Sequence, residues 1–152
     1  MCIRDSALKP QGYSTLQNKP AVRMPPANTV ARNIKYYPYK GDLQGAIDNL
    51  RNPYAGDFSN EVISQGRDYY RIYCSVCHGD NGKDIGLVGQ KLGIIKPPSL
   101  VNEKVSAYPD ARLFHIITDG QGLMRPYNTQ IYKEKHRWAI VQYVRELQKG
   151  RQ

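Results

Sequence analysis

Five consecutive residues, Cys74-Ser75-Val76-Cys77-His78, have the types and the spacing of a c-type haem attachment sequence, C-x-x-C-H. On a helical turn, residues three and four positions apart share a face. Cys74 and Cys77 can therefore both reach the two vinyl groups of one haem, and His78 can point its imidazole at the iron from the same side. The motif predicts one covalently attached haem c and one axial iron ligand.

Two other kinds of site use a pair of cysteines at this spacing. A thioredoxin-type redox pair is expected after a strand, in a βαβ unit. A structural zinc site needs two further thiolates or imidazoles at finger-like spacing. The remaining candidates, Cys2, His115 and His136, are isolated and remote in the sequence. We therefore favour the haem interpretation over both alternatives.

A second ligand to the iron is expected in the loop Gly120-Gln121-Gly122-Leu123-Met124-Arg125-Pro126-Tyr127. Glycines and a proline fix the backbone around Met124, which follows His78 by enough residues for the chain to return across the opposite haem face. Methionine is usually a core filler, but downstream of a C-x-x-C-H motif we interpret it as the ligand. We expect His115 to be a satisfied or surface histidine and His136 to face solvent.

Methionine–histidine ligation raises the reduction potential of a haem above that of a bis-histidine haem. A six-coordinate iron also leaves no position for oxygen or a substrate. The sequence therefore predicts an electron-transfer protein that is not an enzyme by itself. A haem sensor or a peroxidase with a displaceable Met124 is the alternative at this point.

The elements that must position these residues are helical, and neither a repeat nor strand-like alternation is visible. A helix is expected to begin near Ser59 and run into the motif. Its apolar stripe is predicted at Val62, Gly66, Tyr69 and Tyr73, and the internal glycine needs a closely approaching helix to explain it.

Further helices are expected at 109–118 and 133–149, the last ending at Gly150. The buried face of the last helix is predicted at Ile140, Tyr143, Val144 and Leu147. Residues 79–93 are predicted to form a glycine-rich loop, followed by a turn that Ser99 caps. The predicted class is all-α.

Residues 1–58 are predicted to form an extended arm ahead of a domain at 59–150. Proline removes a backbone donor and disfavours helix at the residue before it, and the arm is rich in proline and tyrosine. Apolar periodicity is confined to Leu43–Ile47, which is too short to stand alone. The tyrosines, three of them within residues 36–39, either dock on a partner protein or cover the domain of their own chain. The six prolines between residues 7 and 60 are Pro10, Pro20, Pro25, Pro26, Pro38 and Pro53.

The 152 residues carry a formal net charge of +9, with the basic residues scattered rather than clustered. No nucleic-acid-binding motif accompanies them, so we expect no nucleic-acid partner; the charge suits docking to a redox partner or ordinary solubility. Haem attachment to such motifs implies export, yet no signal peptide or membrane-spanning run is visible. We expect that Met1–Ser6 is not the native start. Membrane association through partners, or through a lost lipid anchor, remains open, as does the role of Cys2.

The last 90 or so residues resemble a class I cytochrome c domain, which has a first helix, C-x-x-C-H, a methionine loop and a last helix. The resemblance implies that Gly66 and Tyr70 cross the last helix at Ile140 and Tyr143. It also implies that a prolyl carbonyl orients the ligand histidine, and Pro97 and Pro98 are both candidates.

Segments covering most of residues 24–148 resemble the monohaem cytochrome c subunit of bacterial alternative complex III. These are Met24–Arg32, Tyr73–Gly79, Lys96–Ser99 and Arg137–Val144. Arg125 departs from the direct Met-Pro pair of many class I domains. The resemblance implies a subunit of a membrane quinol-oxidising complex on the periplasmic face of the inner membrane. It would pass electrons to a cytochrome c or a haem–copper oxidase. The alternative is a freely diffusing periplasmic carrier.

Overall fold

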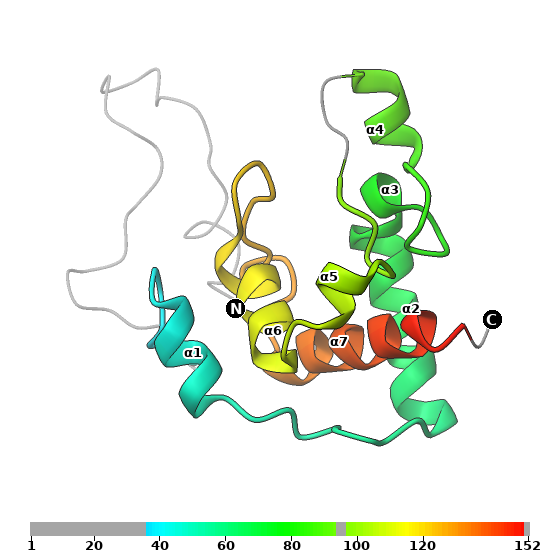
Figure 1. Cartoon of the computed structure of the whole chain (residues 1–152). Coiled ribbons are helices and arrows are strands. Elements are labelled where there is room, and N and C mark those ends of the chain that lie inside the picture. The colour runs from blue at the N-terminus through cyan, green and yellow to red at the C-terminus, as the bar shows by residue number, and fades with distance from the viewer. Residues whose placement is uncertain (1–35, 94–96, 151–152) are drawn as a thin grey trace, which may run out of the picture. The chain divides into compact units, whose positions relative to one another are not determined.

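Two long helices that cross each other organise the fold (Figure 1). The computed structural model describes residues 36–93 and 97–150, and within these residues it has seven helices and no strand, so the all-α prediction is confirmed. The helices are α1 Leu43–Asn49, α2 Asn60–Tyr73, α3 Ser75–His78, α4 Leu87–Leu92, α5 Glu103–Ser106, α6 Asp110–Asp119 and α7 Glu134–Gln148.

The crossing of α2 and α7 depends on Gly66, as predicted from the helix-interior glycine. A Cβ at this position would lie 2.1 Å from the carbonyl oxygen of Ala139 and 2.9 Å from Cβ of Tyr143, so only glycine admits the approach. One turn further along α2, the ring of Tyr70 meets the ring of Tyr143 edge to face, with centroids 5.2 Å apart. The contact of Gly66 and Tyr70 with the last helix is therefore confirmed.

The buried stripe of α2 differs by one residue from the predicted stripe of Val62, Gly66, Tyr69 and Tyr73. Val62, Gly66 and Tyr70 are buried, and Tyr70 has no exposed surface. Tyr69 and Tyr73 are only half-buried, because they lie at the flank of the crossing and stack on each other with centroids 6.2 Å apart. The residues of α2 that enter the core therefore follow i, i+4, i+8 spacing and face α7.

The last helix ends as the sequence predicts, at Gly150, whose φ of 69° is the left-handed conformation that favours glycine after a helix. Along α7, the predicted positions Ile140, Val144 and Leu147 are buried, and the fourth, Tyr143, is half-buried. The apolar core that these helices share comprises Tyr70, Val105, Leu113, Phe114, Ile117, Ile131, Trp138, Ile140, Val141, Val144 and Leu147.

Residues 36–58, which the sequence assigns to the arm, pack against the helices that follow them and belong to the same compact unit. Residues 43–49 form α1, which begins at Asp42, whose carboxylate accepts the amide of Gly45 at 2.8 Å, and which contacts α6. The Tyr37 hydroxyl hydrogen-bonds Nδ1 of His115 at 2.7 Å. Tyr37 therefore covers its own domain, whereas the neighbouring Tyr36 is exposed. The arm motif at 24–32, the start of the chain and Cys2 lie outside the described residues.

The segment between the motif and α6 contains more helix than predicted. Residues 87–92 form α4, so the expectation of a continuous glycine-rich loop over 79–93 is wrong. A Cβ at Gly86 would meet backbone atoms of Ser75 and Val76 within 2.5 Å, so this glycine lets the start of α4 pack on α3. The Ser99 hydroxyl accepts the amide of Val101 at 3.4 Å, at a turn over residues 100–101, as predicted. The next short helix, α5, is capped by Asn102, whose side chain accepts the amide of Val105 at 2.7 Å.

None of the helices in residues 36–93 and 97–150 is long and apolar enough to cross a membrane.

Candidate functional site

The C-x-x-C-H motif lies at the junction of α2 and α3, where the helix axis breaks at Cys74. Cys74 is the last cap residue of α2 and the first of α3, and its amide donates to the Tyr70 carbonyl at 2.8 Å. The Cys74 carbonyl accepts the amides of Cys77 at 3.1 Å and His78 at 2.9 Å. One helical turn thus holds both thiols and the imidazole, as their spacing predicts.

The helix before the motif decides against the thioredoxin interpretation, since that motif follows a strand and Cys74 follows the 14-residue helix α2. In the described residues, no three His, Cys, Asp or Glu side chains come together as a set of metal ligands. Burial, and then the neighbouring Cys77, raise the pKa of Cys74 to about 12. A site that disfavours a thiolate suits a neutral sulfur, such as the sulfur of a thioether to haem.

The imidazole of His78 is oriented by Pro98, which settles which of the two prolines faces it. Nδ1 of His78 lies 3.3 Å from the Pro98 carbonyl oxygen, and because a carbonyl only accepts, Nδ1 carries the proton. The Nε2 lone pair is then free to bind a metal. Burial lowers the pKa of His78, an effect that the Pro98 hydrogen bond opposes, and this favours the neutral imidazole that serves as a ligand.

Backbone contacts fix the loop that leaves His78. The buried hydroxyl of Tyr70 donates to the Gly79 carbonyl at 2.8 Å. The Gly86 amide donates to the Cys77 carbonyl at 2.9 Å. Gly79 has a φ of 69°, and a Cβ there would lie 2.9 Å from the Asp84 carbonyl oxygen. The chain therefore turns sharply just after His78.

Met124 closes a tight hairpin at the end of α6. Its amide donates to the Gln121 carbonyl at 3.0 Å, and its carbonyl accepts the Gln121 amide at 2.9 Å. Gly120, with a φ of 84°, lets the hairpin close, because a Cβ there would lie 2.6 Å from the Met124 carbonyl oxygen. Met124 is half-buried and packs against the core, while Leu123 next to it is exposed.

Aromatic side chains connect this hairpin to the motif. The ring of Tyr127 meets the ring of Tyr73 at 6.1 Å, and the Tyr127 amide donates to the Ile117 carbonyl at 2.9 Å. Burial raises the pKa of Tyr127, and the charges of Cys74 and Cys77 raise it further. In Figure 1 the hairpin and α3 rise on the same side of α7.

The two other histidines have partners of their own. His115 is buried in α6. Its Nδ1 hydrogen-bonds the Tyr37 hydroxyl, and its Nε2 lies 3.8 Å from a carboxylate oxygen of Asp119. The prediction of a satisfied histidine is confirmed. His136 does not simply face solvent, as predicted: it is half-buried and stacks on Tyr69 with centroids 4.4 Å apart.

An all-α fold with a C-x-x-C-H motif between its first long helix and a crossing last helix defines a c-type cytochrome domain of class I. A family model described as cytochrome c oxidase, cbb3-type, subunit III matches residues 61–144, which is more than half of the 152 residues, and the chain belongs to this family. No curated protein matches the sequence.

The cofactor of a cytochrome c domain of this family is covalently bound haem c. The protein is therefore a haem electron-transfer protein that exchanges electrons with other proteins. Domains of this kind are usually extracytoplasmic.

Proposed function

We propose that this protein carries electrons through one haem c, which Cys74 and Cys77 would hold by thioethers and to whose iron His78 and Met124 would bind. When bound, the haem supplies a one-electron couple between ferric and ferrous iron. The observation that carries the proposal is the hydrogen bond from Nδ1 of His78 to the Pro98 carbonyl. This bond leaves the lone pair of Nε2 to bind a metal, and the two thiols lie on the same helical turn.

The proposed residues divide the work. The two cysteines would fix the porphyrin to the junction of α2 and α3, and His78 would supply an imidazole nitrogen to the iron. Met124 would supply a neutral sulfur, which would favour the ferrous state relative to a second imidazole. With both residues bound, the haem would supply electron transfer rather than substrate binding.

Haem staining tests the attachment. The wild-type protein, produced in a host that makes c-type cytochromes, should keep its haem on a denaturing gel, and acid–acetone should not extract it. The oxidised protein should show the weak near-infrared band of a methionine sulfur bound to ferric haem. Complete extraction of the haem would contradict the attachment, and persistence of the band in Met124→Ala would contradict the distal ligand.

For the biological setting, we propose a subunit of a membrane quinol-oxidising complex that passes electrons to a cytochrome c or a haem–copper oxidase. The support is the similarity of Met24–Arg32, Tyr73–Gly79, Lys96–Ser99 and Arg137–Val144 to the monohaem subunit of alternative complex III. The description of the matched family favours a second candidate, a subunit of a cbb3-type oxidase. A freely diffusing periplasmic carrier is the third.

Copurification separates these candidates. Solubilised native membranes should give a complex in which this haem-stained chain accompanies quinol-oxidising activity. A complex that has oxidase activity but no quinol-oxidising activity would favour the second candidate. Recovery of the chain in the soluble fraction would favour the third. Residues 36–58 pack on the domain, so a truncation that tests the arm must spare them. Deletion of residues 7–35 should keep the haem spectrum and release the chain from the complex. Unchanged copurification would show that the domain alone docks.

A further inference from the structure

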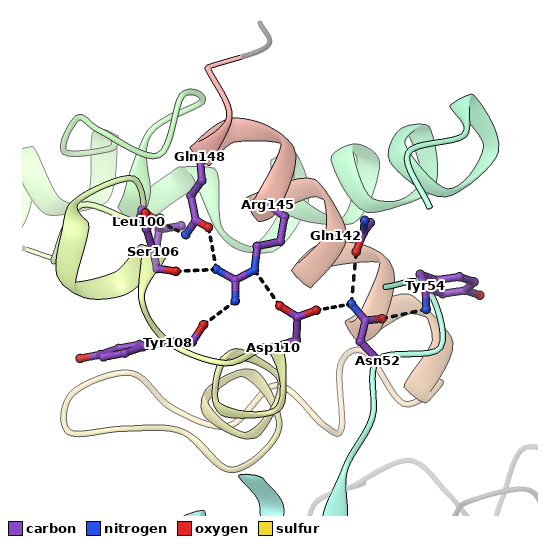
Figure 2. Close-up of polar contacts among 9 residues, drawn as sticks. All are labelled: Asn52, Tyr54, Leu100, Ser106, Tyr108, Asp110, Gln142, Arg145 and Gln148. Carbon is purple, nitrogen blue, oxygen red and sulfur yellow. Dashed lines mark hydrogen bonds and ion pairs between the residues drawn. The ribbon is translucent and has the colours of Figure 1, made fainter. Parts of the chain in front are cut away.

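A polar network at the C-terminal end of α7 gathers segments that are far apart in the sequence (Figure 2). Arg145 is its centre. Its Nε donates to Asp110 Oδ1 at 2.7 Å, its Nη1 to the Ser106 carbonyl at 3.0 Å and to Gln148 Oε1 at 2.8 Å, and its Nη2 to the Tyr108 carbonyl. All these partners lie on α7 or around the start of α6. The guanidinium therefore fixes the orientation of the Gln148 amide, because Oε1 is taken by Arg145.

The other end of the Gln148 amide points to the segment that carries Pro98. Nε2 of Gln148 donates to the Leu100 carbonyl at 2.7 Å. The Leu100 amide in turn donates to the Gly82 carbonyl at 2.8 Å, and the Ser99 hydroxyl donates to the same carbonyl at 3.3 Å. Leu100, which lies two residues after Pro98, is thus held by α7 on one side and by the loop that follows the haem motif on the other.

We propose that Gln148, oriented by Arg145, is a positioning residue that sets the hydrogen bond between Pro98 and His78 and through it the reduction potential. This inference rests on the proposed function, since it takes His78 as the iron ligand. Gln148 does not touch His78; it acts by anchoring the backbone that presents the Pro98 carbonyl.

The geometry of the Pro98 hydrogen bond explains why its anchoring matters. At 3.3 Å, the separation of Nδ1 and the carbonyl oxygen is slightly longer than the usual range for such bonds, about 2.7–3.2 Å. A small outward movement of the carbonyl would weaken it further. A hydrogen bond at Nδ1 raises the basicity of the ligating nitrogen and favours ferric iron. Loss of the anchor should therefore raise the reduction potential.

Gln148→Glu tests the inference most cleanly. The carboxylate keeps an acceptor for Arg145 but has no N–H group for the Leu100 carbonyl. We expect a higher midpoint potential of the haem-loaded protein, and an upfield shift of the Nδ1–H proton resonance of His78 in the reduced state. The added negative charge alone would lower the potential, so a rise comes from the lost anchor. Gln148→Ala should shift both readouts in the same directions.

Asn52→Ala is the matched control, because Asn52 belongs to the far end of the same network. Its Nδ2 contacts Asp110 at 2.7 Å and Gln142 at 3.2 Å, and its Oδ1 accepts the Tyr54 amide at 2.9 Å (Figure 2). Asn52→Ala should lower the midpoint of urea unfolding and leave the potential unchanged. An equal shift of potential in Asn52→Ala would show that general loosening, and not the Leu100 contact, is responsible.

The inference and the proposed function fail in different ways. If Gln148→Glu keeps its covalent haem and its near-infrared methionine band, but neither the potential nor the Nδ1–H resonance moves, or the potential falls, the positioning role is wrong and the haem assignment stands. If the wild-type protein lacks covalent haem, the proposed function itself is wrong. Should Gln148→Ala fail to fold, Gln148→Glu still decides.

Discussion

The two sides of the proposed haem site are attached to the fold in different ways. On the His78 side, the proposed ligand lies in the helical turn α3, which follows α2, and Tyr70 and Pro98 hold the backbone and the ring. On the Met124 side, the proposed ligand closes a hairpin by two hydrogen bonds to Gln121, and most of the hairpin residues are exposed. Segments with few buried contacts open locally at low cost in free energy, whereas core helices open only on global unfolding.

This difference bears on the alternatives for function. A carrier requires Met124 to stay on the iron, and a sensor or peroxidase requires it to leave. The hairpin is joined to the core by Met124 itself and by Tyr127, which contacts Tyr73 and the end of α6. We therefore expect that the Met124 ligand can be lost without loss of the fold, while the His78 side cannot be disturbed without disturbing α2.

The largest effect separates the two sides by haem attachment. The double variant Cys74→Ala, Cys77→Ala should lose all covalent haem, because neither cysteine of the motif remains to form a thioether. Met124→Ala should keep its haem on a denaturing gel and lose only the near-infrared band. Haem staining together with absorption spectra measures both. Covalent haem in the double variant would show that the attachment residues have been wrongly identified.

Gly66→Ala should lower the unfolding free energy by disturbing the crossing of α2, the helix that leads to His78, with α7. The new Cβ would lie 2.1 Å from the Ala139 carbonyl oxygen, and since this atom belongs to the backbone, α2 and α7 must separate. Overpacking of a core typically costs about 1–3 kcal/mol of unfolding free energy, and we expect the upper part of this range. Urea unfolding of the haem-loaded protein measures it.

Asp68→Ala, at an exposed position of the same helix, is the control for Gly66→Ala and should change the unfolding free energy by less than about 0.5 kcal/mol. Equal stability of the two variants would mean that the helices do not cross as closely as described.

The sequence was sufficient for the helical class, for the crossing at Gly66 and for the ends of α6 and α7, because each depends on local patterns that a single helix displays. The stripe of α2 was predicted one residue off, since Tyr69 and Tyr70 are both aromatic and only the facing helix distinguishes them. The helix α4 was missed because the five glycines between residues 79 and 93 suggested a loop, yet Gly86 allows α4 to pack on α3.

For the candidate site, the C-x-x-C-H spacing suffices to predict that the three residues lie together, but not which proline faces His78. That choice depends on a contact between residues 20 positions apart in the sequence. The roles of Tyr37 and Gln148 depend on contacts with residues 78 and 48 positions away. No local pattern marks such partners. The placement of residues 36–58 on the domain has the same origin, because α1 is stable only on α6.

Tyr37→Phe should weaken the attachment of residues 36–58 to α6, the helix that leads into the Met124 hairpin. The change removes the hydroxyl 2.7 Å from Nδ1 of the buried His115 and leaves that nitrogen without its partner. We expect a loss of about 1–2 kcal/mol in unfolding free energy, measured with urea. Tyr36→Phe is the matched control, since Tyr36 is 81% exposed. An equal loss in both variants would contradict a specific role for the Tyr37 hydroxyl.

The smallest effect concerns His136, whose stack on Tyr69 continues through Tyr73 to Tyr127 beside the Met124 hairpin. Burial lowers the pKa of His136, and the charges of Lys135 and Lys133 lower it further. In the unfolded chain the pKa returns to about 6.5. The unfolded state then binds more protons below that pH, so the stack contributes stability that is complete above about pH 6.5 and is lost as the pH falls through the folded-state pKa.

Proton NMR of the reduced protein should therefore show His136 titrating below its ordinary pKa. Lys133→Gln should move that pKa back part of the way, since burial is the larger cause and remains. His136→Gln should have unfolding midpoints that depend less on pH between about pH 5 and pH 7 than those of the wild type. A folded-state pKa of His136 at or above about 6.5 would mean that the ring leaves Tyr69 in solution. The aromatic stack would then not brace the Met124 side, and the contrast between the two sides of the site would be larger than the contacts indicate.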